Sequence, residues 1–211
     1  MVIGLGRFGL ALAQQLQALG QEVLGIDARA EQVQAASGLL TFVVQADATD
    51  PEVLLQLGVD SVNLAVVAIG DDMQSSILAT ASLADVGVTR LWAKAVTEQH
   101  ATILERVGAD SVVFPERDMG RRVAHRVAEN VLEYFQVDDG FALAETCVPS
   151  SFVGRTLAES RIREDRNVTV VCVRSADGAF GHAAPEHRFA DGDVVLVAGS
   201  NTDVERFAVT S

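Results

Sequence analysis

Short apolar runs alternate with amphipathic stretches along the first 115 residues of the chain. Apolar runs bounded by glycine or polar residues predict strands, and apolar residues spaced three or four apart predict helices. Such alternation builds βαβ units, and the rules for strand connections then predict an α/β fold with a Rossmann-like, doubly wound parallel sheet. The predicted strands are residues 1–3, 22–26, 41–45, 62–69, 91–95 and 111–114, and the predicted helices are residues 7–19, 30–37, 51–57, 74–86 and 98–107.

Beyond Pro115 the pattern changes to a single long helix over residues 116–135. Apolar residues at 119, 123, 127 and 131 fall four apart, so one stripe of this helix should be buried. Arginines at 117, 121, 122 and 126 make the helix basic. Two interpretations stay open for them, a solvated face and a neighbouring anionic ligand or acidic surface.

The C-terminal part predicts a smaller α+β domain, rich in strands. Strands are predicted at residues 141–148, 168–174 and 194–197, and helices at residues 156–162 and 203–207. Turns are marked by Asp177-Gly178 and by Asp191-Gly192-Asp193, since Asp-Gly pairs favour turns. The sequence therefore predicts an α/β domain over residues 1–115, a helical linker over 116–137 and a second domain over 138–211.

A glycine motif lies between the first predicted strand and helix. Gly4, Gly6 and Gly9 match GxGxxG, in which the first glycine permits a tight turn, the second lets a phosphate approach and the third allows close packing. The helix start would then present N–H groups to phosphate. The motif alone is weak evidence, but its place between strand and helix predicts a nucleotide site.

Acidic and basic residues end three of the predicted strands. Asp27 stands about 20 residues past the glycines, where a carboxylate binds ribose hydroxyls and repels the 2′-phosphate of NADP. Its alternative is an ordinary surface or capping residue. Asp47 either flanks the adenine or caps the helix at Pro51. Lys94 either binds phosphate, since a buried lysine needs a partner, or is a solvated strand end.

Charge and composition exclude several classes of protein. With 16 basic and 29 acidic residues the formal charge is −13, which argues against nucleic acid and anionic lipid as partners. Cys147 and Cys172 have no metal-type spacing and are expected to be buried thiols. No apolar run could span a bilayer and no secretory signal is present, which predicts a cytoplasmic protein. The first residue already lies in a strand, so we expect further residues to precede it.

No set of residues for proton transfer, metal binding or nucleophilic attack accompanies the glycine motif. A dehydrogenase would need a second domain that brings substrate and a general acid or base to the nicotinamide. This absence favours a binding protein that is not an enzyme. An NAD-dependent oxidoreductase is the alternative, and a stand-alone nucleotide sensor is a third possibility.

Taken together, several motifs resemble the RCK (regulator of potassium conductance) domains, and among them the Ktr/Trk potassium-uptake regulatory subunits. The similarity extends over the whole chain. The motifs that carry it are the glycine motif, Asp27, residues 46–49, residues 67–70, residues 91–95, residues 108–110 and residues 114–120.

The resemblance implies a cytosolic gating subunit beneath a membrane potassium-translocating subunit of the Ktr/Trk kind, at the inner face of the membrane. It implies homodimers joined by a crossover helix and assembled into an octameric ring. ATP would activate transport, ADP would restrain it, and NAD or NADH would bind some members. Transferred to this sequence, the expected nucleotide contacts are Gly4, Gly6, Arg7, Phe8, Gly9, Asp27, Ala28, Arg29, Asp47, Ala48, Ile69, Gly70, Asp71, Lys94, His100 and Glu116.

Two further ligands are implied by the same resemblance. Glu116 matches an acid that holds Mg²⁺ or Ca²⁺ between paired nucleotides, although it could equally be a helix-start carboxylate favoured by the helix dipole. The C-terminal domain is similar to modules that bind cyclic di-AMP across a two-fold axis. At the nucleotide site this chain departs from its relatives, which often carry Asn where it has Arg29 and Asp47. The residues expected at the second site are Arg163, Val168, Val170 and Pro185, and a solvated Arg163 on a domain that only dimerises is the alternative.

Overall fold

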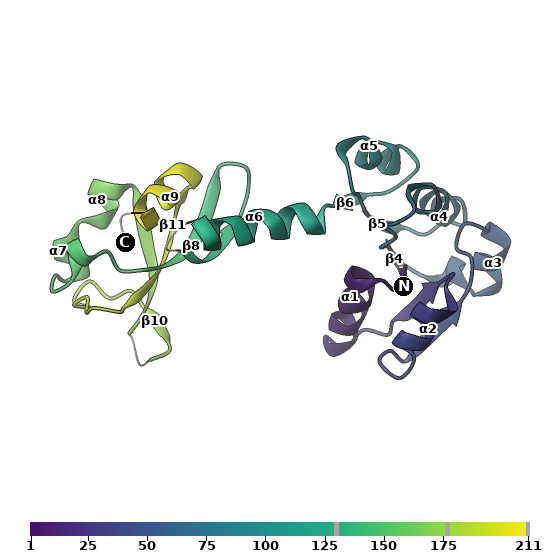
Figure 1. The fold of residues 1–211 in the computed structure, drawn as a ribbon, viewed down its shortest axis with the longest axis horizontal. Helices are drawn as coiled ribbons and strands as arrows, with labels where there is room; N and C mark the ends of the chain where they lie inside the picture. Colours follow the sequence, from purple (N-terminus) through teal and green to yellow (C-terminus); the bar gives the residue numbers. More distant parts are fainter. Residues whose placement is uncertain (129–130, 176–177, 210–211) are drawn as a thin grey trace. The chain divides into compact units, whose positions relative to one another are not determined.

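The computed structural model describes residues 1–128, 131–175 and 178–209. The chain divides into two compact units, Met1–Glu116 and Arg117–Ser211 (Figure 1). Each unit has its own sheet, and each is described here by itself. No helix among the described residues has the length and apolarity needed to cross a bilayer.

The first unit contains the predicted doubly wound sheet, all of whose strand pairs are parallel. The strand order β3-β2-β1-β4-β5-β6 places β1 at the centre, where the order along the chain reverses. In open α/β sheets ligands bind at this switch point, outside the carboxyl ends of the strands. The strands are β1 (Val2–Ile3), β2 (Leu24–Asp27), β3 (Phe42–Gln45), β4 (Leu64–Val67), β5 (Arg90–Lys94) and β6 (Ser111–Val113).

Helices cover both faces of this sheet, which buries two separate apolar clusters. On one face Val2 and Leu5 pack with Ala13 of α1, and on the other Ile3 and Val67 pack with Leu83 of α4. Asp50 caps α3 through the Glu52 amide, and Asp72 caps α4 through two amides. The helices are α1 (Arg7–Ala18), α2 (Ala30–Ala36), α3 (Pro51–Gln56), α4 (Met73–Asp85) and α5 (Glu98–Arg106), with a 3₁₀ turn at Val59–Ser61.

The long helix predicted over residues 116–135 is wrong in its second half. Helix α6 covers Pro115–Ala128, and Val131–Gln136 forms strand β7, paired antiparallel with β8. Aromatic and β-branched residues fit a strand that is buried on one face. Val131 and Tyr134 lie in the core of the second unit, and a register shift between Val131 and Glu133 interrupts the regular alternation of the strand.

The apolar stripe of α6 is exposed within the single chain. Met119 is 53% exposed, Val123 45% and Val127 81%. The described part of this chain therefore does not cover these three residues, and their burial against a partner stays a prediction. The fourth member of the predicted stripe, Val131, is buried only because it belongs to β7.

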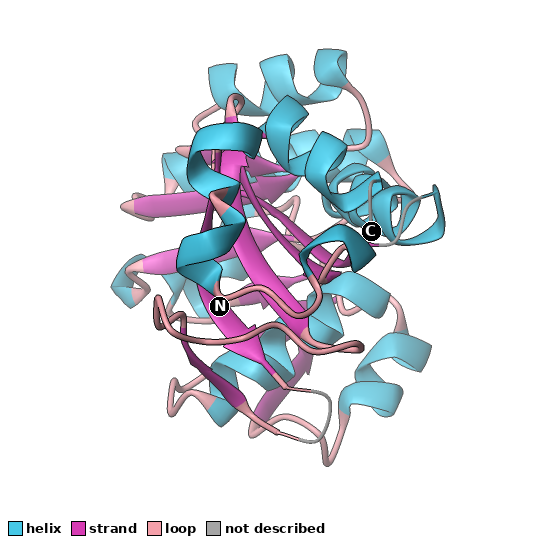
Figure 2. Cartoon of the chain, turned by 90° about the vertical axis from the view of Figure 1, so that its left-hand side faces the viewer, coloured by secondary structure: helices cyan, strands magenta, loops and turns pink. Residues whose placement is uncertain are grey.

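The second unit is an α+β domain built on an antiparallel sheet with the order β10-β9-β11-β8-β7. Helix α9 packs on β8 and β11, and α8 packs on β9. Phe189, Val197 and Phe207 are among the residues of its core. The remaining elements, coloured by type in Figure 2, are β8 (Phe141–Cys147), a 3₁₀ turn (Ser150–Phe152), α7 (Leu157–Ser160), α8 (Ile162–Arg166), β9 (Val168–Arg174), β10 (Phe180–His182), β11 (Val194–Ser200) and α9 (Asn201–Val209).

Several smaller expectations for this unit change. Strand β10 was not anticipated, and the helix predicted at residues 156–162 is two short helices, because Arg161 between them adopts a left-handed conformation with φ of 48°. Gly192 turns with φ of 82°, whereas Asp177 of the other predicted turn lies outside the described residues. Cys147 is exposed and Cys172 half-buried, so neither is the buried thiol expected.

Leu54 and Leu55 provide a matched test of the core of the first unit. Leu54 is fully buried and its neighbour Leu55 is 51% exposed. We expect Leu54→Ala to lower the free energy of unfolding by about 2–5 kcal/mol, because it leaves a cavity, and Leu55→Ala to change it by under about 0.5 kcal/mol. Denaturant unfolding followed by the fluorescence of Trp92, the single tryptophan, reports on this unit. Equal losses for both variants would contradict the packing described.

Candidate functional site

The carboxyl edge of the parallel sheet gathers most of the predicted nucleotide contacts. Because all six strands run the same way, the segment after each strand emerges at this edge. The glycine turn follows β1, Asp27 ends β2, Asp47 follows β3, residues 69–71 follow β4, Lys94 ends β5 and Glu116 comes after β6.

Glycine stands at each of the three motif positions for a different reason. Gly4 has φ of +88°, which side chains disfavour, and a Cβ on Gly9 would lie 1.9 Å from the Gly4 carbonyl oxygen. The protein's own backbone thus requires both. Gly6 differs, since it has φ of −66° and nothing lies within 4 Å of a Cβ placed there. A glycine that the fold does not need suits close approach by a ligand phosphate.

The start of α1 adds an electrostatic reason for a phosphate at this turn. Gly6 is the N-cap and offers no side-chain hydrogen bond, and the first turn contains no acidic residue. The first N–H groups of a helix have no partners within the helix, and the helix dipole favours negative charge there. Residues at this turn therefore fit an anionic group such as a pyrophosphate.

Asp27 is buried beside the glycine turn and orients it. Its Oδ2 atom accepts the Leu5 amide at 2.7 Å, and its Oδ1 atom accepts the Arg29 amide at 2.9 Å. The side chain is only 5% exposed. A carboxylate has about four acceptor positions, two on each oxygen. Arg29 Nε also reaches Oδ1, at 3.4 Å, so the position left for a ribose hydroxyl is on Oδ2. The alternative of an ordinary surface residue is therefore wrong. The Leu5 amide is a contact that the sequence did not suggest.

Arg29 bridges two sides of this edge. Its Nη1 atom lies 2.7 Å from Asp71 Oδ2, and its Nε atom lies 3.4 Å from Asp27 Oδ1. The hydrogen bond to Asp27 is the main cause that raises the pKa of Arg29. Arg29 and Asp71, both predicted to contact the nucleotide, therefore lie side by side at this edge. The ion pair between them joins segments that are 42 residues apart in the sequence.

A second ion pair lies at the far end of the same edge. Lys94 is 8% exposed, and its Nζ atom lies 2.5 Å from Glu116 Oε1. The ammonium is also 5.9 Å from the centre of the Phe8 ring. A Cβ on Gly70 would lie 2.7 Å from Nζ, so this glycine makes room for the lysine. The sequence placed Gly70 at the site without showing this function.

Glu116 is held ionised by its cationic neighbours. The hydrogen bond from Lys94 lowers the pKa of Glu116, and the charge of exposed Arg7 lowers it further. One carboxylate that a lysine already engages does not by itself form a divalent-ion site. Among the residues that the structure describes, no three His, Cys, Asp or Glu side chains gather as a metal site would require.

The alternative function considered for Asp47 is not found. Asp50 caps the helix at Pro51, whereas Asp47 Oδ1 accepts the amide and hydroxyl of Thr49. Asp47 is exposed and Ala48 beside it is buried. Exposed Ala28 accepts a hydrogen bond from Gln45 through its carbonyl oxygen. Asp47 therefore stabilises its own turn at the place expected to flank the adenine.

His100 lies inside the first unit and not on its surface. The side chain is fully buried, Nδ1 is 3.4 Å from the Val96 amide, and Nε2 has no hydrogen-bond partner among the described residues. Burial lowers the pKa of His100, which keeps the ring neutral. A direct contact with phosphate would therefore require the surrounding side chains to move.

The residues expected at a second ligand site separate into two groups. Arg163 of α8 and Pro185 are exposed. Val168 is 1% exposed within the core of the second unit, and Val170 packs against the same core. Val168 thus has no surface to form a wall of a ligand site.

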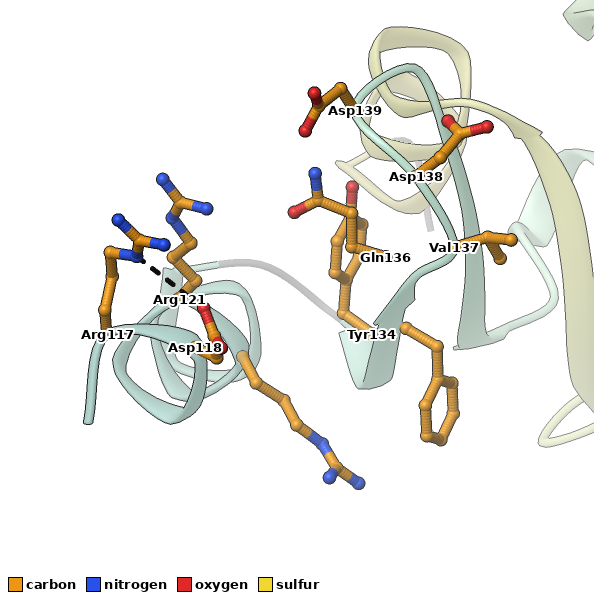
Figure 3. A pocket seen from close by; sticks show the side chains of 10 residues that line it. Arg117, Asp118, Arg121, Tyr134, Gln136, Val137, Asp138 and Asp139 are labelled. Atoms are coloured by element: carbon orange, nitrogen blue, oxygen red, sulfur yellow. Dashed lines mark ion pairs between the residues drawn. The ribbon is translucent and has the colours of Figure 1, made fainter. Parts of the chain in front are cut away.

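A groove of about 510 Å³ lies in the second unit between α6, β7 and the turn after β7 (Figure 3). One arginine of the groove faces an acidic neighbour, since Arg122 Nη2 is 2.6 Å from Glu133 Oε2. Arg126 of α6, which does not line the groove, lies 3.4 Å from the same glutamate. The acidic neighbour considered for the basic helix is thus present. Asp118, Asp138 and Asp139 also line the groove, so its charge favours neither anions nor cations.

A glycine turn, a buried carboxylate and flanking cations at the edge of a doubly wound sheet form a candidate nucleotide site. Comparisons with known proteins agree: residues 1–115 match the TrkA-N domain and residues 146–209 match the TrkA-C domain. The chain is 32% identical to Ktr system potassium uptake protein A of Bacillus subtilis (strain 168) over 207 residues, which is 98% of this chain and 93% of that protein. It is 35% identical to protein C of the same system, with 98% and 94% covered.

The chain therefore belongs to the family of Ktr potassium uptake proteins built from TrkA-N and TrkA-C domains. Solved structures agree in fold. The GsuK RCK domain superposes with a TM-score of 0.68 at 19% identity, over 98% of this chain and 46% of that one. The GsuK channel bound to NAD gives 0.67 at 18% identity, over 98% and 38%, and GsuK bound to ADP gives 0.53 at 19% identity, over 62% and 35%.

Gly6 and Gly9 separate ligand binding from folding. We expect Gly9→Ala to lower the stability of the first unit by about 1–3 kcal/mol, because the new Cβ overlaps the Gly4 carbonyl. Gly6→Ala should leave the stability almost unchanged and weaken adenine-nucleotide binding, because its Cβ intrudes on the phosphate. Thermal melting and calorimetry measure the two effects. A Gly6→Ala variant that binds ADP as tightly as the wild type would show that no phosphate binds close to Gly6.

Proposed function

We propose that this protein is the nucleotide-binding regulatory subunit of a potassium-uptake system and is not an enzyme. The observation that carries the proposal is the glycine turn, whose Gly6 faces open space beside the buried Asp27 carboxylate at the switch point of the sheet. In this proposal residues 1–115 bind the nucleotide and residues 138–211 form a regulatory domain. Family membership supports the assignment to potassium transport.

The proposed ligands are adenine nucleotides. Asp27 would accept hydrogen bonds from the ribose, and the amides at the start of α1 would bind the phosphates. Arg7, exposed on the first turn of α1, would contact the terminal phosphate and so distinguish ATP from ADP. NAD or NADH is a second candidate, since structures of GsuK have been solved with NAD and with ADP. The carboxylate of Asp27 disfavours the 2′-phosphate of NADP.

Assembly is proposed from the exposed stripe of α6. Met119, Val123 and Val127 form an apolar row that a second copy of α6 or a neighbouring subunit would cover. The family resemblance extends this to homodimers in an octameric ring, docked at the cytoplasmic face of a potassium-translocating membrane subunit. ATP would favour the ring shape that permits transport, and ADP the shape that restrains it.

An Asp27 variant tests the nucleotide assignment. Loss of a charge-assisted hydrogen bond costs roughly 1.5–3 kcal/mol, so Asp27→Asn should weaken ADP by about tenfold to a hundredfold. Asn keeps one acceptor for the Leu5 amide, so thermal melting without ligand checks that folding survives. Arg7→Ala should weaken ATP more than ADP. Unchanged calorimetric affinity for both nucleotides in both variants would defeat the proposal.

Transport itself distinguishes the two classes of function. The protein should co-purify with a co-expressed potassium-translocating subunit, and potassium flux into vesicles that contain both should be higher with ATP than with ADP. The oxidoreductase alternative instead predicts oxidation of a hydroxy acid, with a rise in absorbance of NADH. That rise, without any effect on flux, would replace the regulatory function by the enzymatic one.

A divalent cation between paired nucleotides is a finer part of the proposal. Two triphosphates held close together repel, and Mg²⁺ or Ca²⁺ with oxygen ligands offsets this repulsion. Because Lys94 already engages Glu116, the other ligands would have to come from phosphates and a second copy of the chain. Glu116→Gln should reduce the Mg²⁺ dependence of ATP-driven flux severalfold. An unchanged Mg²⁺ dependence would refute the cation site.

Cyclic di-AMP at the second unit stays a proposal that rests on the resemblance and on exposed Arg163 and Pro185. Val168 is removed from the expected wall because it lies in the core. The two-fold ligand predicts one cyclic di-AMP per two chains and loss of binding in Arg163→Ala. Calorimetry on the whole protein that shows no heat of binding would end this proposal.

A further inference from the structure

We propose that the ion pair between Arg29 and Asp71 closes over the glycine turn and must open for a phosphate to bind, so that Asp71 competes with the ligand for Arg29. This inference rests on the proposed nucleotide function and identifies a residue pair that sets specificity at the same site. Asp71 would lower the affinity of each nucleotide in proportion to how strongly that nucleotide interacts with Arg29.

The topology places this pair across the turn. Strand β1 lies between β2 and β4, Arg29 comes shortly after β2, and Asp71 comes after β4. A contact between the two side chains therefore spans the carboxyl end of β1, where the glycine turn begins. The bond from Arg29 Nη1 to Asp71 Oδ2 is 2.7 Å. A phosphate over the turn would have to pass or replace it.

The two ends of Arg29 are held unequally. Its backbone amide and Nε contact Asp27 Oδ1, at 2.9 and 3.4 Å, and Asp27 is buried. The Nη1 end reaches Asp71 on the surface, where the side chains are 51% and 64% exposed. The base of the residue is thus fixed beside the ribose carboxylate. Its fork can exchange one anionic partner for another with little movement of the backbone.

Exchange is favourable only for a ligand with negative charge. Exposed ion pairs contribute little, whereas a guanidinium binds phosphate through two parallel, charge-assisted hydrogen bonds. A ligand phosphate can therefore replace the Asp71 carboxylate as the partner of Arg29. A neutral nucleoside cannot, so it gains nothing from release of the arginine. Arg29 would thus favour phosphorylated nucleotides over adenosine, and Asp71, by competing for Arg29, would reduce that preference.

Asp71 could also act simply by repelling the ligand, and the two effects can be separated. Repulsion between Asp71 and phosphate persists when Arg29 is absent, whereas competition for Arg29 disappears. A double-mutant cycle over Asp71→Asn and Arg29→Gln therefore isolates the competition. Glu31→Gln is the matched control, because Glu31 is exposed on the next helix and has no ion pair among the described residues.

The experiment is calorimetric titration of the full chain with ADP and with adenosine. With Arg29 present, Asp71→Asn should tighten the binding of ADP by about threefold to fivefold, and in the Arg29→Gln background by less than about twofold. Adenosine affinity and the Glu31→Gln variant should change by less than about twofold. Thermal melting without ligand confirms that each variant is folded.

An equal gain from Asp71→Asn in both backgrounds would overturn the competition and leave plain repulsion. An equal gain for adenosine would overturn it as well, because adenosine offers Arg29 no anion. Absence of ADP binding by the wild-type protein would overturn the proposed function itself, and this inference with it. The two failures are therefore distinguishable.

Discussion

The contact between Gly9 and the carbonyl of Gly4 is the constraint on which the first unit depends. A Cβ at position 9 would lie 1.9 Å from the Gly4 oxygen, so the start of α1 can reach the end of β1 only through glycine. That close approach directs the first amides of α1 at the switch point of the sheet. It also brings the Leu5 amide within 2.7 Å of Asp27, which ties the turn to the neighbouring strand.

Two cations flank this turn, and each is already paired with an exposed carboxylate. Arg29 pairs with Asp71, whose side chain is 64% exposed. Lys94 pairs with Glu116, whose side chain is 67% exposed. Exposed carboxylates give up a cation at small cost, because water solvates them once they are released. Without a ligand, a carboxylate neutralises each cation. When phosphates replace these carboxylates as partners, both cations can bind them. Such an arrangement suits a protein that binds and releases nucleotides reversibly.

The fold, and the segments that meet at the carboxyl edge of the sheet, could be predicted from the sequence because they depend on local patterns. The glycine motif and the alternating apolar runs each act within a few residues, and Asp27 is recognised by its place at the end of a strand; the structure has all three where they were expected. Strand β7 was missed because the spacing of Met119, Val123 and Val127 continues numerically to Val131, although α6 ends at Ala128. Periodicity alone cannot show where a helix gives way to a strand that finds its partner in β8.

The side-chain partners at the edge were beyond sequence reasoning. Arg29 and Asp71 are 42 residues apart, and Lys94 and Glu116 are 22 apart, so their pairing depends on strand order and side-chain conformation. The burial of His100 and Val168 has the same origin. A residue at the correct place in the sequence can face the core, as these two do.

Hydrogen–deuterium exchange with and without ADP tests most directly whether the glycine turn is the nucleotide site. If it is, ADP should slow exchange in peptides that cover residues 4–10, 27–30 and 69–72, since these segments meet at the carboxyl edge of the sheet. Peptides from β8 and β11 in the second unit should change much less. Protection confined to the second unit, or none at the turn under saturating ADP, would contradict the account.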